Sequence, residues 1–133
     1  MIEKLKIAKI YKDLDLSFTA HPVTGDVAKK LDVNAVKQSL RILMLSNFYE
    51  RPFAAEKAGN IRGFLFENFS DTTSRALEFS LRNLIDTYEK RAKIEDIRVT
   101  ASPNTNLLNI SINFYVVGIP DTQTLSFNIE RLR

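Results

Sequence analysis

The stretch that decides the fold is a run near the C-terminus in which apolar and polar side chains alternate, Leu108-Asn109-Ile110-Ser111-Ile112-Asn113-Phe114-Tyr115-Val116. Because successive side chains of a β-strand point to opposite faces, this period of two predicts a long strand with one apolar face. The same alternation marks a strand on either side, at Ile97 and Val99 before it and at Leu125, Phe127 and Ile129 after it. Strands joined by short turns usually pair with their neighbours in sequence, so we predict a three-stranded antiparallel meander.

Two helical patterns precede these strands. The first should begin at a capping residue, Asp32 or Asn34, and should end before Pro52, because proline disfavours a helical conformation in the residue before it. The second and longer helix should be capped by Asp71. Both carry apolar residues at helical spacing, which are Val33, Val36, Leu40, Leu43 and Met44 in the first and Leu77, Leu81, Leu84, Ile85 and Tyr88 in the second.

The outer face of the second helix carries charges of both signs. Glu78–Arg82 and Asp86–Lys90 have the four-residue spacing that favours ion pairs on a helix surface. Each such pair contributes only about 0.2–0.5 kcal/mol, so the helix must depend on burying its apolar stripe.

The N-terminal part predicts a hairpin. Leu14, Leu16 and Phe18 alternate with polar residues as in a half-buried strand, the segment 21–26 has turn chemistry, and a short strand through 27–31 can follow. The lysine-rich segment 1–12 fits neither a clean strand nor a clean helix, and it is either an arm that orders against a partner or a frayed terminus. The overall prediction is one α+β domain over residues 1–133, in which the meander packs on two helices.

Composition narrows the functional classes. The chain has 133 residues, no cysteine and a net charge of +3, with basic and acidic residues largely interleaved. Disulfides and thiolate metal sites are therefore ruled out, and a reducing cytoplasm fits. No apolar run is long enough to cross a bilayer, the first residues lack the apolar core of a signal peptide, and basic charge is not concentrated on one face. We expect neither a nucleic-acid nor a membrane partner.

Catalysis finds little support in the sequence. The single histidine, His21, precedes a proline in a turn without a suggested nucleophile, no cluster of metal ligands occurs, and the four glycines are too dispersed to cradle a phosphate. A glycosidase needs two carboxyl groups, for which Glu50, Glu56 and Glu67 are the candidates, but no glutamate is followed nine residues later by an aspartate. The arginine beside Glu50 should also keep that carboxyl ionised. We expect no catalytic residues, cofactor or metal.

The segment between the two helices has the composition of a docking surface. Tyr49-Glu50-Arg51-Pro52-Phe53 is followed by Gly59-Asn60-Ile61-Arg62-Gly63-Phe64-Leu65-Phe66-Glu67, so that charged residues stand beside large apolar ones. One interpretation is a local Glu50–Arg51 ion pair with Phe53 and Phe64 in the core, although an exposed pair contributes only about 0–1 kcal/mol. The other is an anchor in which Arg51 and Arg62 flank an aromatic cluster made by Phe64, Leu65, Phe66 and Phe69.

This segment resembles the signature of the contractile-tail baseplate wedge family, whose members include sheath-initiating proteins of phage tails and a baseplate component of type VI secretion systems. The match is carried by Glu50-Arg51, Gly59, Arg62 and Leu65-Phe66-Glu67. The sequence departs from the signature at Pro52, directly after the arginine, and at Ala54, Ala55 and Ala58. With this resemblance, the predicted protein-interaction residues are Glu50, Arg51, Pro52, Phe53, Arg62, Phe64 and Phe66.

The resemblance implies a structural role in the tail baseplate of the virion, with assembly in the host cytoplasm. Expected partners are other baseplate wedge proteins and tail sheath subunits, with several copies of the chain in each baseplate. The last predicted strand precedes Arg131-Leu132-Arg133 and has a polar, uncharged outer face, so it can offer an open edge for strand addition unless the N-terminal residues cover it. The alternatives are a peptidoglycan-cleaving tail lysozyme and a small regulatory adaptor built on the same fold.

Overall fold

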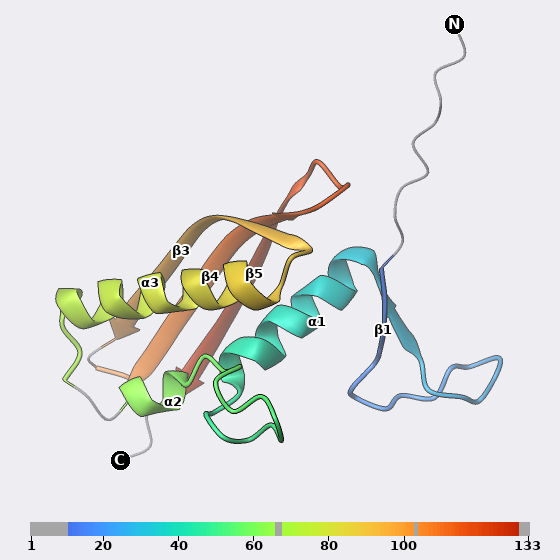
Figure 1. The fold of residues 1–133 in the computed structure, drawn as a ribbon, viewed down its shortest axis with the longest axis horizontal. Coiled ribbons are helices and arrows are strands. Elements are labelled where there is room, and N and C mark those ends of the chain that lie inside the picture. The colour runs from blue at the N-terminus through green and yellow to red at the C-terminus, as the bar shows by residue number, and fades with distance from the viewer. Residues whose placement is uncertain (1–10, 66–67, 103, 131–133) are drawn as a thin grey trace, which may run out of the picture.

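The computed structural model describes residues 11–65, 68–102 and 104–130 (Figure 1). The N-terminal arm at 1–10, Phe66, Glu67 and the last three residues lie outside the described residues. The elements follow in the order β1 (Lys12–Leu14), β2 (Lys29–Leu31), α1 (Asp32–Leu45), α2 (Ile61–Phe64), α3 (Asp71–Tyr88), β3 (Ala92–Ser102), β4 (Leu107–Val116) and β5 (Thr122–Glu130).

The three C-terminal strands form one antiparallel sheet in the order β3-β4-β5. In the centre of the sheet Ile112 lies opposite Ile97 on β3 and Leu125 on β5. Gly118 has a φ of +94°, a backbone conformation that glycine adopts readily, and it lies in the turn between β4 and β5. The predicted apolar face of β4 is buried, at Leu108, Ile110, Ile112, Phe114 and Val116. The α+β fold and the meander are confirmed, whereas the extent of the domain stays a prediction.

Helices α1 and α3 both supply buried residues to the core against this sheet (Figure 1). From α1 come Ala35, Val36, Leu40, Leu43 and Met44, and from α3 come Leu77, Leu81 and Ile85. Helix α1 ends at Leu45, ahead of the predicted limit, and Tyr88 at the end of the α3 stripe is 39% exposed. The helical spacing therefore identified the buried faces correctly, apart from Tyr88.

The predicted caps and surface ion pairs are wrong. Asp32 is the first residue of α1, and its Oδ1 accepts a hydrogen bond from the backbone N–H of Tyr11 (3.2 Å). Helix α3 is capped by Ser70, whose side chain accepts from the N–H of Thr73. Glu78 accepts from the main chain of β3, and Lys90 donates to the main-chain carbonyl of Asp86 (2.7 Å) instead of its carboxylate.

The N-terminal hairpin exists, but its strands are short and its apolar side chains are not covered. β1 pairs with β2 over three residues each. The prediction of a half-buried strand is wrong, because the side chains of Leu14, Leu16 and Phe18 are exposed. The hairpin projects beyond the helices (Figure 1), and Phe18 has a positive φ in a turn. His21 lies in the turn as predicted, where its Nδ1 accepts backbone N–H groups of Val23 and Thr24.

A polar network fastens the hairpin to the rest of the molecule. Arg91 donates to the buried carboxylate of Glu89 (2.8 Å) and to Asp13 on β1 (3.3 Å), while Ser39 of α1 donates to the second oxygen of Glu89 (2.5 Å). Burial by itself raises the pKa of Glu89, but the hydrogen bonds from Arg91 and Ser39 outweigh it, and the net pKa is lowered. The network thereby joins β1, α1 and the start of β3.

Candidate protein-interaction site

The loop between α1 and α2 is closed at its base by backbone hydrogen bonds. The N–H of Asn60 donates to the carbonyl of Ser46 (3.0 Å), and the N–H of Gly59 donates to the carbonyl of Leu43 (3.0 Å). The two ends of the segment 46–60 therefore meet at the end of α1, as in an Ω-loop. We call this segment the aromatic loop.

Close contact at the base depends on glycine. A Cβ built on Gly59 would lie only 2.3 Å from the carbonyl oxygen of Met44, which belongs to the backbone of α1 and cannot easily move away. Because glycine has no side chain, the C-terminal part of the loop can lie directly against the end of α1.

The aromatic loop presents large side chains to solvent. Phe53 is fully exposed, Tyr49 is 86% exposed and Phe48 is 47% exposed. Tyr49 and Phe53 both have positive φ, at 67° and 63°, a region that residues with side chains rarely occupy. A bond from the N–H of Tyr49 to the carbonyl of Ala55 (3.0 Å) spans the loop and helps to hold this conformation.

The pKa of Glu50 is lowered, in the direction that the sequence predicts, but chiefly for a different reason. Its Oε1 accepts a hydrogen bond from Asn47 Nδ2 (2.7 Å). Hydrogen bonds from the backbone and side chain of Asn47 lower the pKa of Glu50, and the charges of Arg62 and Arg51 lower it further. The described ion pairs do not include one between Glu50 and Arg51.

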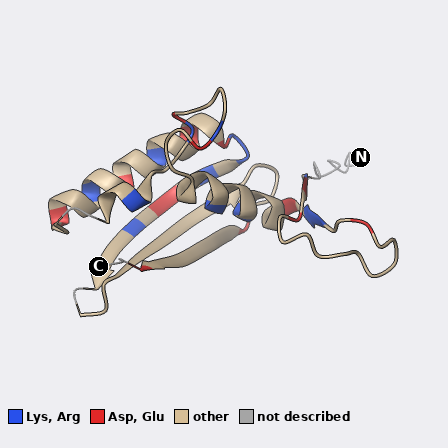
Figure 2. Ribbon diagram, turned by 90° about the horizontal axis from the view of Figure 1, so that it is seen from below, with Lys and Arg blue, Asp and Glu red and all other residues tan. Residues whose placement is uncertain are grey.

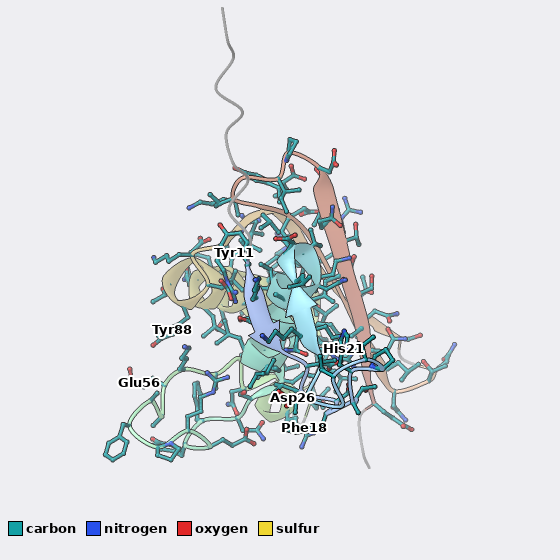
Figure 3. All side chains as sticks on the ribbon, turned by 90° about the vertical axis from the view of Figure 1, so that its right-hand side faces the viewer. Tyr11, Phe18, His21, Asp26, Glu56 and Tyr88 are labelled. Carbon is teal, nitrogen blue, oxygen red and sulfur yellow. The ribbon has the colours of Figure 1, made fainter. Side chains whose placement is uncertain are left out.

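Arg51 lies beside a hollow of about 480 Å³ between the aromatic loop and the hairpin. The hollow is also lined by Leu14 and Leu16 of the hairpin, by Lys57, and by Tyr88 of α3. Lys57 Nζ stands 5.6 Å from the centre of the Tyr88 ring, which joins the loop to the helix. In Figure 3 the loop, marked by Glu56, and the hairpin turn, marked by His21 and Asp26, both lie on the lower side of the molecule.

The structure divides the residues predicted to contact a partner. Glu50, Arg51, Pro52 and Phe53 share the aromatic loop, and Arg62 is exposed on α2. Phe64 instead packs against the core, as do Leu65 and Phe69, and Phe66 lies outside the described residues. The predicted anchor is thus the loop with its arginines, and the described part of the aromatic cluster belongs to the core.

The predicted interaction residues do not include Phe48, Tyr49 or Tyr88. The first helix is predicted only to end before Pro52, Tyr49 opens the segment with the composition of a docking surface, and Tyr88 is expected in a buried stripe. Two adjacent aromatic residues immediately before the Glu-Arg pair were the available signal for the first two. For Tyr88 the signal was its place at the end of the apolar stripe, where a helix often emerges from the core.

The described residues give little support to a metal site or a membrane-spanning helix. These residues contain no group of three or more histidine, aspartate or glutamate side chains that could hold a metal ion. Within the same ranges, no helix has the length and apolar character needed to span a membrane.

The sequence is 27% identical over 115 residues to the baseplate wedge protein gp25 of Enterobacteria phage T4, a match that covers 86% of each chain. The fold matches a chain of the cryo-EM structure of the anti-feeding prophage baseplate with a TM-score of 0.72 and 26% identity, covering 84% of this chain and 90% of that one. No family model matches the sequence.

The fold also matches the crystal structure of a putative tail lysozyme from Geobacter sulfurreducens, with a TM-score of 0.66. This match covers 74% of the present chain and 89% of the other, and at 17% identity it reflects the fold alone.

The architecture is therefore one found in contractile-tail baseplates. The chain is homologous to the baseplate wedge protein of phage T4, and its resemblance to contractile-tail baseplate proteins is confirmed.

Proposed function

We propose that the chain is a structural subunit of a contractile-tail baseplate wedge, present in several copies in the virion tail and assembled in the host cytoplasm. The observation that carries the proposal is the 27% identity to a baseplate wedge protein over most of both chains. In this role the chain contacts other wedge proteins through its aromatic loop and starts sheath polymerisation by pairing a strand of a sheath subunit with β5.

The aromatic loop supports contact with a wedge partner. Exposed aromatic and arginine side chains are the residues that most often dominate protein interfaces. The loop offers Tyr49 and Phe53 to solvent and Arg51 beside a hollow, on a backbone that is closed at its base. A closed loop loses little conformational entropy on binding, so its aromatic side chains can contribute fully to affinity.

The free edge of β5 supports strand addition. Among the described residues β5 has a single strand neighbour, β4. Between Arg98 and Glu130 the sequence contains only one charged residue, Asp121, and Figure 2 shows β4 and β5 almost without coloured charges. Since charged side chains are a common protection of an edge strand, an uncharged edge is open to pairing with a strand from another chain.

The first test is complementation of extracts from infected cells that lack this protein, with baseplates and tails scored by electron microscopy. Arg51→Ala should fold with a melting temperature within about 2 °C of wild type, because Arg51 makes no described ion pair, yet it should fail to restore baseplates. Arg41→Ala, which removes an exposed arginine from α1, is the matched control and should restore them.

Normal assembly with Arg51→Ala would remove Arg51 from the interface. A loss of several degrees in melting temperature with normal assembly would make it a structural residue instead. Failure of the wild-type protein to restore baseplates would contradict the wedge role itself.

Peptidoglycan cleavage is the second candidate, favoured only by the fold shared with a putative tail lysozyme. A glycosidase acid needs a raised pKa, whereas Asp15, Glu50 and Glu89, the described carboxyl groups with a shifted pKa, all have a lowered one. We expect no clearing in a peptidoglycan zymogram with the refolded protein. A cleared band would contradict this expectation. If the band persisted in Glu50→Gln but was lost in another carboxylate variant, the carboxylate removed in that variant would be the catalytic acid.

A further inference from the structure

The central sheet has two edges, and they are not equivalent. β3 and β5 each have β4 on one side only among the described residues, so alternate backbone N–H groups of both strands point away from the sheet. If both edges were open, β5 of one copy could pair with β3 of the next. Such a head-to-tail contact does not close on itself, and it leads to filaments.

The edge of β3 is occupied by a side chain of the same molecule. The backbone N–H of Val99 donates to Glu78 Oε1 at 2.9 Å. Glu78 lies in the middle of α3, the helix that runs beside β3 in Figures 1 and 2, and Val99 itself is buried. A hydrogen bond from an amide to a carboxylate is stronger than one to a neutral acceptor, so an incoming strand would have to displace a favourable partner.

Other features of β3 also disfavour the pairing of another strand at this edge. The ladder between β3 and β4 is irregular between Ile94 and Asp96, and bulges of this kind are frequent protections of sheet edges. β3 also carries charges of both signs, at Lys93, Glu95, Asp96 and Arg98. On β5 the only charged residue is Glu130, at its last position.

A hollow borders β3 close to Glu78. A hollow of about 660 Å³ lies between α3 and the sheet, and it is lined by Val99, Thr100, Ser102 and Leu107. Glu78 lines the same hollow and binds the amide there.

We propose that Glu78 closes the β3 edge, so that the sheet accepts a partner strand only at β5 and copies of the chain cannot stack edge to edge. The biological meaning of this closure rests on the strand addition proposed above. The closure itself is a property of the isolated chain, so it can be tested, and can fail, separately from the role in the baseplate.

The experiment compares Glu78→Ala with Glu78→Gln, which keeps an acceptor oxygen at the same place. By NMR hydrogen exchange, the Val99 amide should exchange at least about tenfold faster in Glu78→Ala and within about threefold of wild type in Glu78→Gln. By sedimentation velocity from about 10 μM to 1 mM, Glu78→Ala should form growing oligomers while Glu78→Gln sediments like wild type.

A third variant identifies the surfaces that pair. Ser126→Lys/Asn128→Lys places two charges on exposed positions of β5, and in the Glu78→Ala background it should restore the sedimentation of wild type. Wild-type exchange at Val99 in Glu78→Ala, or sedimentation like that of wild type in this variant, would overturn the closure. Oligomers that persist with both lysines in place would overturn the pairing of β5 with β3.

Circular dichroism checks that each variant retains native helix and strand content. If Glu78→Ala does not, Glu78→Met takes its place, because methionine keeps the length of the side chain and a high helix propensity without an acceptor oxygen. The exchange rate of the Val99 amide and the sedimentation of Glu78→Met then decide the proposal, as they do for Glu78→Ala.

Discussion

Glu89 is the buried acid that holds three elements together. Its carboxylate accepts from Ser39 of α1 and from Arg91, which in turn reaches Asp13 of β1. With only 5% of the residue exposed, an ionised carboxylate at this place is tolerated because both of its oxygens have donors. The lowered pKa of Glu89 records the same interactions.

This carboxylate predicts an acid-sensitive stability. Because the pKa of Glu89 is lower in the folded chain than in the unfolded chain, its contribution is complete above the unfolded value of about 4.3 and is lost as the pH falls through the folded value. Glu89→Gln should lower the free energy of unfolding by roughly 1–3 kcal/mol at pH 7 and by less at pH 3. Urea denaturation followed by circular dichroism at several pH values measures the difference.

The control for this prediction is Glu56→Gln, which removes an exposed carboxylate of the aromatic loop. Its stability should follow the wild-type curve at each pH. An equal loss for Glu89→Gln at pH 3 and pH 7 would show that shape, and not charge, matters at this position.

At the scale of elements, the join between α1 and the aromatic loop depends on the missing side chain at Gly59. Gly59→Ala should destabilise the fold by about 1–3 kcal/mol, since the added methyl group meets the backbone of Met44 at 2.3 Å and cannot be accommodated without moving the helix end. The loss is measured by urea denaturation.

Gly63→Ala is the matched control for this prediction. Its Cβ would meet only the flexible end of the Asn60 side chain (2.8 Å), so a smaller loss is expected. Equal losses in the two variants would contradict the role of close approach at Gly59.

At the scale of elements, the meander could be predicted from the sequence, whereas the exposure of the hairpin could not. The meander was predictable because β4 alternates strictly and one of its faces is buried. The hairpin faces were not, because the alternation of Leu14, Leu16 and Phe18 gives no sign of whether another element covers them. The composition of the loop predicts interaction residues there. The positive φ of Tyr49 and Phe53, which turns both side chains to solvent, could not be predicted, because it depends on contacts formed only in the folded chain.

At the scale of the whole molecule, the open edge predicts a separation of two assembly steps. Ser126→Lys/Asn128→Lys should enter baseplates normally, because the aromatic loop is unchanged, but tails should lack sheath. Lysines at two exposed positions of β5 make pairing with another strand unfavourable without removing any core side chain. Electron microscopy of complemented extracts scores both steps.

The control places the same charges elsewhere on the surface. Thr72→Lys/Ser80→Lys adds two lysines to exposed positions of α3 and should give sheathed tails. Sheathed tails with the β5 variant would contradict strand addition at this edge, provided that its circular dichroism is native.

The network around Arg91 also has a consequence for synthesis on the ribosome. The hairpin leaves the ribosome first, but Arg91 follows Asp13 by 78 positions. At about 5–20 residues per second, the hairpin waits roughly 4–16 s before the side chain that fastens it has been made. During this interval the backbone of the hairpin is not fastened to the rest of the chain, so the nascent chain should be most vulnerable to cleavage near its N-terminal end until translation has passed Arg91.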